Sequence, residues 1–136
     1  MIKAKELSLG CHIEHNGAIY KVKSIIDNAD EGIQIDVFND NEALSLTESQ
    51  LNPIEIHEKY LKRLGFKYDT TFNTLLLNSS KGIILCAEKK EDEEEDEEKK
   101  NYKINIAYVG DTNIIRFGTV ESLHQLELLI YIFTQL

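Results

Sequence analysis

The sequence predicts a mainly β, α+β fold, in which a small Src-homology-3-like barrel precedes an antiparallel sheet covered by two helices. Three observations support this prediction. Short alternating segments crowd the first part of the chain, an amphipathic helix follows the only proline, Pro53, and a capped apolar helix ends the chain. A chain of 136 residues can bury one good core or two small ones. We therefore expect two domains, a barrel-like one over residues 1–52 and an α+β one over residues 53–136.

Four short strands are expected in the first domain. Residues 11–15 alternate between apolar and polar side chains and run into Asn16-Gly17, the strongest short hairpin signal, and residues 18–26 continue on the far side. Residues 33–38 alternate in the same way, and residues 43–47 make a fourth strand. Closure into a barrel would leave few free edges. Barrels of this kind bind peptides, RNA or DNA, or no ligand at all, so the fold alone identifies no function.

Residues 52–66 carry the clearest helix signals in the chain. Acidic side chains come early and basic ones late, as the helix dipole favours, and Gly65 followed by Phe66 predicts a left-handed stop. The start is weak because the best-placed N-cap is His57, where Ser, Thr, Asp or Asn is preferred. One helical stripe holds the apolar residues Ile56, Tyr60, Leu61 and Leu64. We expect a structural helix that covers a sheet.

Further strands are expected after this helix, at residues 66–69, 72–77, 83–87, 102–109 and 113–117. The pairing of the first two is left open around residues 69–71. Residues 83–87 are almost continuously apolar, which predicts a central strand.

The last helix is predicted from Leu123 to about Phe133. Ser122 and Gln125 have the spacing of a capping box, in which each side chain satisfies a backbone amide at the helix start. The apolar face is so broad that it must be covered on more than one side. We expect the helix to lie between the sheet and the barrel, because exposed apolar patches of that size are unusual on monomers. The alternative is a contact with a partner chain, including a homo-oligomer formed through this helix.

The net charge of −9 is concentrated in one loop. Residues 88–100 hold nine acids and four bases and so carry −5, which leaves −4 for the rest of the chain. Neither part is a basic surface of the kind that binds nucleic-acid phosphates non-specifically. Residues 91–98 are eight consecutive carboxylates, which favours a solvated, extended hairpin tip. A weak divalent-cation site and mimicry of a nucleic-acid backbone are the alternatives.

The sequence contains no recognisable constellation of catalytic or metal-ligating residues. Cys11, His12 and His15 come nearest. On a strand, however, His12 points to the face opposite the other two, so the three cannot converge on a metal. Neither cysteine has a nucleophile motif, and there is no glycine-rich phosphate loop. We expect Cys11 and Cys86 to be buried reduced thiols, and we predict a protein that is not an enzyme and holds no cofactor or metal.

The chain also lacks the signals of membrane insertion and export. No stretch approaches the ~18 apolar residues that a membrane span needs. The N-terminus is too polar for a signal peptide. We therefore expect a cytoplasmic protein that does not engage a membrane.

Two segments carry a family resemblance. Residues 53–66, PIEIHEKYLKRLGF, are similar to a pattern of the form P-I-P-L-T-E-E-W-L-L-K-F-G-F, and residues 124–134, HQLELLIYIFT, to H-Q-L-Q-N-L-Y-F-A-L-T. Residues 6–10 and the hairpin at residues 16–22 add further matches. Together they resemble a family of small uncharacterised proteins of Bacteroides-type bacteria, their phages and mobile elements. The resemblance implies a phage or mobile-element setting and supplies no activity or functional residues.

The chain departs from the family pattern in its first helix and in its acidic run. His57 stands where the pattern has Thr, Glu55 where it has a second Pro, and Tyr60 where it has Trp. The first change weakens the start of the helix. The acidic insertion has no counterpart in the pattern, so this loop is peculiar to the chain.

Two functional hypotheses follow. The favoured one is a non-catalytic interaction module that binds another protein. The alternative is a nucleic-acid-linked regulator, acting by direct binding through the barrel, with Lys21 and Lys23 contributing, or by acidic-loop mimicry of nucleic acid. The candidate interaction surface joins the basic face of the first helix to the acidic run: Lys59, Lys62, Arg63, Glu91, Asp92, Glu93, Glu94 and Glu95.

Overall fold

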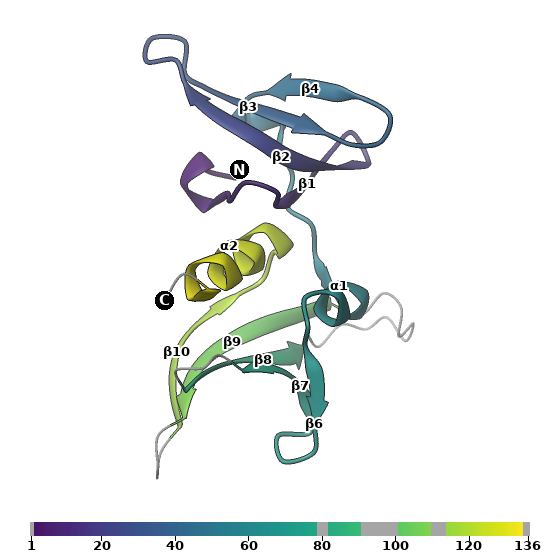
Figure 1. Ribbon diagram of the computed structural model, residues 1–136, viewed down its shortest axis with the longest axis vertical. Helices are drawn as coiled ribbons and strands as arrows, with labels where there is room; N and C mark the ends of the chain where they lie inside the picture. Colours follow the sequence, from purple (N-terminus) through teal and green to yellow (C-terminus); the bar gives the residue numbers. More distant parts are fainter. Residues whose placement is uncertain (1, 79–81, 91–100, 110–113, 135–136) are drawn as a thin grey trace. The chain divides into compact units, whose positions relative to one another are not determined.

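The computed structural model of the chain describes residues 2–78, 82–90, 101–109 and 114–134 (Figure 1). The fold is mainly β, with two antiparallel sheets and two α-helices, which confirms the predicted class. The chain divides into two compact units. Unit 1 comprises Met1–Ile54 and Ser122–Leu136, and unit 2 comprises Glu55–Glu121.

This division differs from the expected ranges 1–52 and 53–136 in one element, the C-terminal helix. Helix α2 (Leu123–Thr134) contacts the first strand and the first short helix of the chain, and therefore belongs to unit 1. Its first amide, that of Leu123, donates to the Ile54 carbonyl oxygen at 2.8 Å. The structure thus assigns α2 to the unit that holds the half-barrel, an assignment that helical periodicity does not specify.

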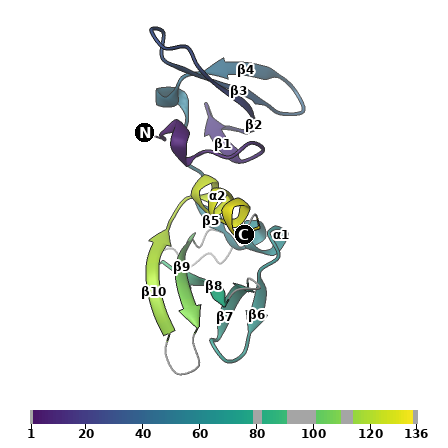
Figure 2. The same ribbon diagram turned by 60° about the vertical axis from the view of Figure 1, so that its left-hand side comes forward.

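Unit 1 is built on a four-stranded sheet in the order β1-β2-β3-β4 (Figure 2). All four predicted strands are confirmed. Glu14 of β1 exchanges backbone hydrogen bonds with Asn52, at 3.0 and 2.8 Å, which partly closes the curled sheet into a half-barrel. The elements are η1 (Ala4–Glu6), β1 (His12–His15), β2 (Ala18–Asp27), β3 (Ile33–Phe38), β4 (Ala43–Leu46) and η2 (Glu48–Gln50).

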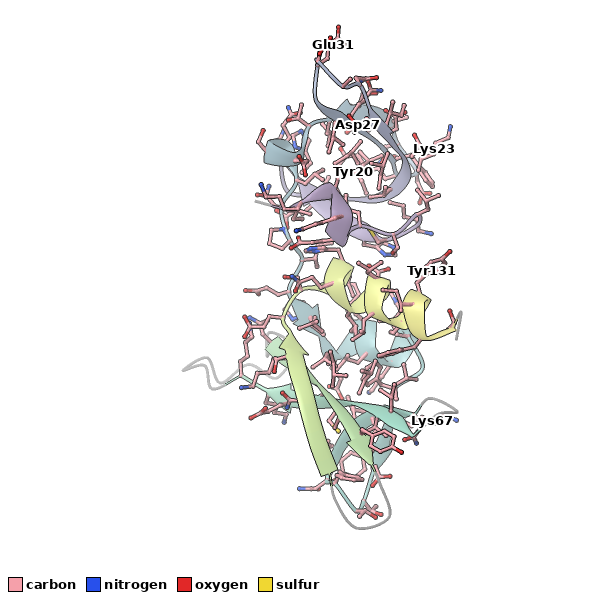
Figure 3. The ribbon with its side chains drawn as sticks, turned by 90° about the vertical axis from the view of Figure 1, so that its left-hand side faces the viewer. Tyr20, Lys23, Asp27, Glu31, Lys67 and Tyr131 are labelled. Carbon is pink, nitrogen blue, oxygen red and sulfur yellow. The ribbon has the colours of Figure 1, made fainter. Side chains whose placement is uncertain are left out.

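The β1–β2 hairpin turns at Asn16-Gly17, as predicted. Both residues have positive φ, 49° and 80°, which gives the turn the backbone twist that suits a two-residue hairpin. Tyr20 and Val22 then point into the core of unit 1, whereas Lys23 lies on the exposed face (Figure 3). The core is a single cluster of Ile2, Leu7, Cys11, Ile13, Tyr20, Val22, Ile35, Val37, Leu46 and Leu51.

Unit 2 holds a five-strand antiparallel path in the order β10-β9-β8-β7-β6, with a short β5 added beside β9. Strand β8 lies between β7 and β9, so its prediction as a central strand is confirmed. The open pairing around residues 69–71 is resolved as a β6–β7 hairpin. The elements are β5 (Ile56–His57), α1 (Glu58–Arg63), β6 (Lys67–Asp69), β7 (Thr74–Asn78), β8 (Ile83–Lys89), β9 (Asn101–Val109) and β10 (Ile114–Val120).

Helix α1 is shorter than its apolar stripe suggested, because Ile56 pairs with Tyr102 as part of β5. His57 is the N-cap, and its side chain makes no capping hydrogen bond. The predicted stop is confirmed: Gly65 has φ 96°, its amide donates to Lys62, and the Phe66 amide donates to Leu61 at 3.0 Å. These two bonds make a Schellman ending, with Leu61 and Phe66 both buried.

The second sheet buries side chains on both faces. Residues opposite one another in the register share a face, so Leu85 and Ile106 lie on one face while Ile84 and Ala107 lie on the other. Leu85, Ile84 and Ala107 are all buried. Neighbouring positions along a strand are therefore buried together.

Candidate binding site

The three basic residues predicted as an interaction surface lie on α1, and all are exposed. The Lys62 ammonium lies 3.6 Å from the Glu58 carboxylate, one helical turn earlier. The Lys59 ammonium lies 5.1 Å from the centre of the Tyr60 ring. Lys59 and Lys62 thus each have a partner, and exposed pairs of this kind are weak.

The acidic half of the predicted surface, Glu91, Asp92, Glu93, Glu94 and Glu95, lies outside the described residues. The hairpin that carries it is described up to Lys90, whose amide donates to the Asn101 carbonyl oxygen at 2.9 Å. The Lys90 ammonium also lies 3.8 Å from the Glu121 carboxylate. The β8–β9 hairpin is therefore established on both sides of the run.

Strands β7 and β8 separate at one end. They pair from Asn78 opposite Ile84 to Leu76 opposite Cys86. Beyond this point β7 still pairs with β6 on its other edge, and β8 continues along β9. The Thr74 hydroxyl donates to the Ala87 carbonyl oxygen, so a side chain closes the ladder where the backbones part. We call this place the seam.

Two adjoining cavities, each of about 490 Å³, lie at the seam. Both are lined by Asn73, Thr74 and Lys89. We call the two cavities together the cleft. Its α1 side is lined by Glu58, Lys62, Phe66, Tyr68, Leu75 and Tyr102, and its β9 side by Phe72, Cys86, Ala87, Glu88 and Asn105.

The α1 side of the cleft combines aromatic rings with positive charge. Phe66 and Tyr102 are buried, and Tyr68 is exposed with its hydroxyl donating to the Asn73 side-chain oxygen. The ammonium groups of Lys62 and Lys89 outnumber the single carboxylate of Glu58. This side therefore offers apolar walls and a small positive excess.

The β9 side of the cleft has a buried amide, that of Asn105, which is 9% exposed. Its nitrogen donates to Glu88 at 2.7 Å, and its oxygen accepts from the Thr119 hydroxyl at 3.1 Å. The Lys103 ammonium lies 3.5 Å from the same Glu88 carboxylate. Sequence reasoning missed this network, because Asn105 occupies an ordinary polar position in an alternating strand.

Unit 1 holds the cysteine and histidines examined for metal binding. Burial raises the pKa of the Cys11 thiol to about 11, so it remains protonated at neutral pH. His12 and His15 each have another partner: the Nδ1 of His12 lies 2.8 Å from Glu127, and that of His15 lies 2.9 Å from the Gln50 carbonyl oxygen. Within the described ranges, no group of three or more His, Cys, Asp or Glu side chains is placed to hold a metal ion.

The two cysteines differ in burial. Both are free thiols, and Cys11 is buried as expected. Cys86 is only half-buried, which corrects the prediction that both would be buried. It lies on the face of β8 that also carries the cleft-lining Glu88, because the two residues are two positions apart.

The exposed face of the half-barrel carries a second polar network that the sequence did not suggest. The Asp36 carboxylate accepts hydrogen bonds from Gln34, Ser45 and Ser24 at 2.9, 2.7 and 3.0 Å. These bonds lower the pKa of Asp36, since they favour its charged form. The network is fully formed by side chains of β2, β3 and β4, which makes it a structural feature of the sheet surface.

No protein-family model, curated protein or solved structure matches the chain. Among the described residues, no helix has both the length and the apolar character to cross a membrane. The resemblance of residues 53–66 and 124–134 to the Bacteroides-type family stays a prediction. A function must therefore be inferred from the geometry of the cleft.

Proposed function

We propose that the protein is a non-catalytic interaction module that binds another protein through the cleft. The observation that carries the proposal is the separation of β7 from β8, which leaves two adjoining cavities of about 490 Å³ beside the basic face of α1. Cavities of a few hundred Å³ are the size of common ligand sites. The candidate residue Lys62 lines this cleft.

An extended segment of the partner suits the cleft best. In an antiparallel sheet, the backbone N–H and C=O groups of successive residues point to opposite neighbouring strands, so residues two positions apart point to the same neighbour. The Ala87 carbonyl points toward β7, where Thr74 meets it. Lys89, two residues further on, directs its backbone toward the same side, beyond the end of the β7–β8 ladder. A partner strand placed there would add backbone hydrogen bonds to side-chain contacts, the usual mode of strand addition.

The side chains that the partner presents follow from the cleft lining. Phe66, Tyr68 and Tyr102 favour an aromatic or aliphatic side chain. Lys62 and Lys89 favour one carboxylate nearby. A long acidic tract is disfavoured, since the whole chain carries −9 and would repel it.

The proposed setting is the cytoplasm of a bacterial host. The family resemblance implies a phage or mobile element, where a non-catalytic module would act by binding a partner. The partner is then a host protein with an exposed, extended segment of the stated composition.

Site-specific photo-crosslinking tests this proposal. Benzoylphenylalanine is placed at Phe72, which lines the cleft and is 38% exposed, and separately at Phe38, which lies on the half-barrel and is 39% exposed. We expect an adduct of defined mass from the Phe72 position and none from the matched Phe38 position. Equal adducts from both positions, or an adduct from Phe38 alone, would contradict the proposal.

Charge reversal gives the second arm of the test. Lys62→Glu with Lys89→Glu should remove the adduct, whereas Lys21→Glu with Lys23→Glu changes the net charge equally and should leave it intact. An adduct that disappears on nuclease treatment would favour the nucleic-acid-linked alternative instead.

A further inference from the structure

Helix α2 is held to the rest of unit 1 by two histidine–carboxylate pairs. Glu127 of α2 accepts from the backbone amide of His12 at 2.9 Å, and its second oxygen lies 2.8 Å from the His12 imidazole. One turn earlier on α2, the Nε2 of His124 lies 3.4 Å from the Glu6 carboxylate of η1. Each pair joins α2 to a segment more than a hundred residues away in sequence.

The two pairs differ in their exposure to water. His124 is 2% exposed, whereas the side chain of His12 is 33% exposed. Within the described residues, the Nδ1 of His124 is buried and has no hydrogen-bond partner. Because a carboxylate only accepts, the contact with Glu6 places the single proton of a neutral imidazole on Nε2 and leaves Nδ1 bare. A second proton on Nδ1 would then be a buried donor without an acceptor.

We propose that His124 makes the docking of α2 sensitive to acid: α2 is held on the half-barrel at neutral pH and is released in mildly acidic solution. This device lies in unit 1 and is independent of the cleft in unit 2. Release would expose the apolar residues Leu123 and Leu126, which are buried in the docked helix.

The sign follows from the surroundings of His124. Burial lowers the pKa of His124 below its ordinary value of 6.5, and the carboxylates of Glu6 and Glu127 oppose this shift only in part. The released helix exposes the imidazole to water, so it binds a proton more readily than the docked one. Docking of α2 is therefore fully favoured above pH 6.5 and weakens as the pH falls below this value.

Two other titratable groups face α2, namely His12 at the start of β1 and Cys11 just before it. The pair of His12 with Glu127 is partly exposed, so water and salt limit the strength of its interaction. Cys11 stays a neutral thiol across the acidic range and contributes no charge. The buried imidazole of His124 therefore decides the direction.

Hydrogen exchange measured by mass spectrometry tests the proposal. Exchange of residues 123–134 is compared at about pH 7.5 and about pH 5.5, after correction for the intrinsic dependence of exchange on pH. In the unmodified protein we expect protection of α2 to fall about threefold or more at the lower pH. In His124→Gln it should not change, because Gln can donate to Glu6 and takes up no proton.

His15→Gln is the matched control, because the imidazole of this histidine contacts the Gln50 carbonyl oxygen and, among the described residues, forms no hydrogen bond with α2. It should keep the full response to pH. Unchanged protection in the unmodified protein, or a full response in His124→Gln, overturns the proposal. If His124→Gln fails to fold, NMR titration of the His124 imidazole in the unmodified protein decides: a pKa at or above 6.5 overturns it, and a lower one supports it.

Discussion

On β2 and β3 of the half-barrel, Val22 lies opposite Val37 and both are buried, while Lys21 lies opposite Phe38 on the exposed face. On β9 of the second sheet, Ile104 and Asn105 are adjacent, face opposite ways and are both buried. In a sheet with one buried face, the alternation of apolar and polar residues along each strand specifies the register. In a sheet buried on both faces, the sequence does not show this alternation. A polar group inside such a sheet needs hydrogen-bond partners, and Asn105 has them in Glu88 and Thr119.

The largest effects on stability should come from truncating a buried side chain in the core of either unit. Ile35 and Ile104 are both fully buried, one in each unit. Ile35→Ala and Ile104→Ala should each lower the free energy of unfolding by about 2–5 kcal/mol, because each leaves a cavity. Urea unfolding measures the loss, and hydrogen exchange locates it. If each substitution lowers protection equally in both units, the two units unfold as one and the comparison between them fails.

A smaller effect is expected at the end of α1. Gly65→Ala should cost about 1–2 kcal/mol, because φ is 96° there and a side chain disfavours that conformation. The new methyl would meet only Leu77, at an ordinary 3.7 Å, so the cost would be conformational. Gly118→Ala is the matched control, since nothing lies within 4 Å of its added carbon and its φ is not in the left-handed range. Thermal unfolding should separate the two; equal losses would refute the assignment to φ.

The seam can be probed at Thr74. Thr74→Val keeps the shape of the side chain and removes its hydrogen bond to the Ala87 carbonyl, which should cost about 1 kcal/mol. Exchange of the β7 and β8 amides near the seam should rise in this variant. Thr71→Val replaces an exposed threonine in the β6–β7 turn and should change neither quantity. Protection at the seam that is the same in both variants would show that Thr74 does not close the ladder.

The smallest effect is expected on the exposed face of the half-barrel. Hydrogen bonds lower the pKa of Asp36 below its ordinary value of 3.8. The stability that the Asp36 carboxylate contributes is therefore present above pH 3.8 and is lost as the pH falls through the pKa of the folded state. Ser45→Ala should move that pKa upward, because it removes one of the donors. NMR titration of the Asp36 carboxyl carbon measures the change, with Ser49→Ala as the control. An Asp36 pKa that stays fixed in Ser45→Ala would mean that the network does not act on its charge.

Part of the candidate site could be predicted from the sequence. Lys62 was found because a charged residue on the polar side of an amphipathic helix is visible from periodicity alone. Lys89, Asn73 and Asn105 were missed, because the cleft lies where the β7–β8 ladder ends while β7 still pairs with β6 on its other edge. The point at which a ladder ends depends on the whole sheet and leaves no local pattern.

The sequence by itself determined the elements whose causes lie within a few residues. The turn at Asn16-Gly17 follows from backbone conformations that these residues readily adopt, the end of α1 follows from Gly65, and the central position of β8 follows from its apolar run. The tertiary structure alone decided which unit α2 joins and whether Ile56 joins a helix or a strand. It also decided that the whole side chain of His124 is buried, with its Nδ1 left without a partner among the described residues. Burial against any surface that excludes water stabilises an apolar side chain. The pattern of apolar residues therefore determines that a face is buried, whereas long-range packing determines which surface buries it.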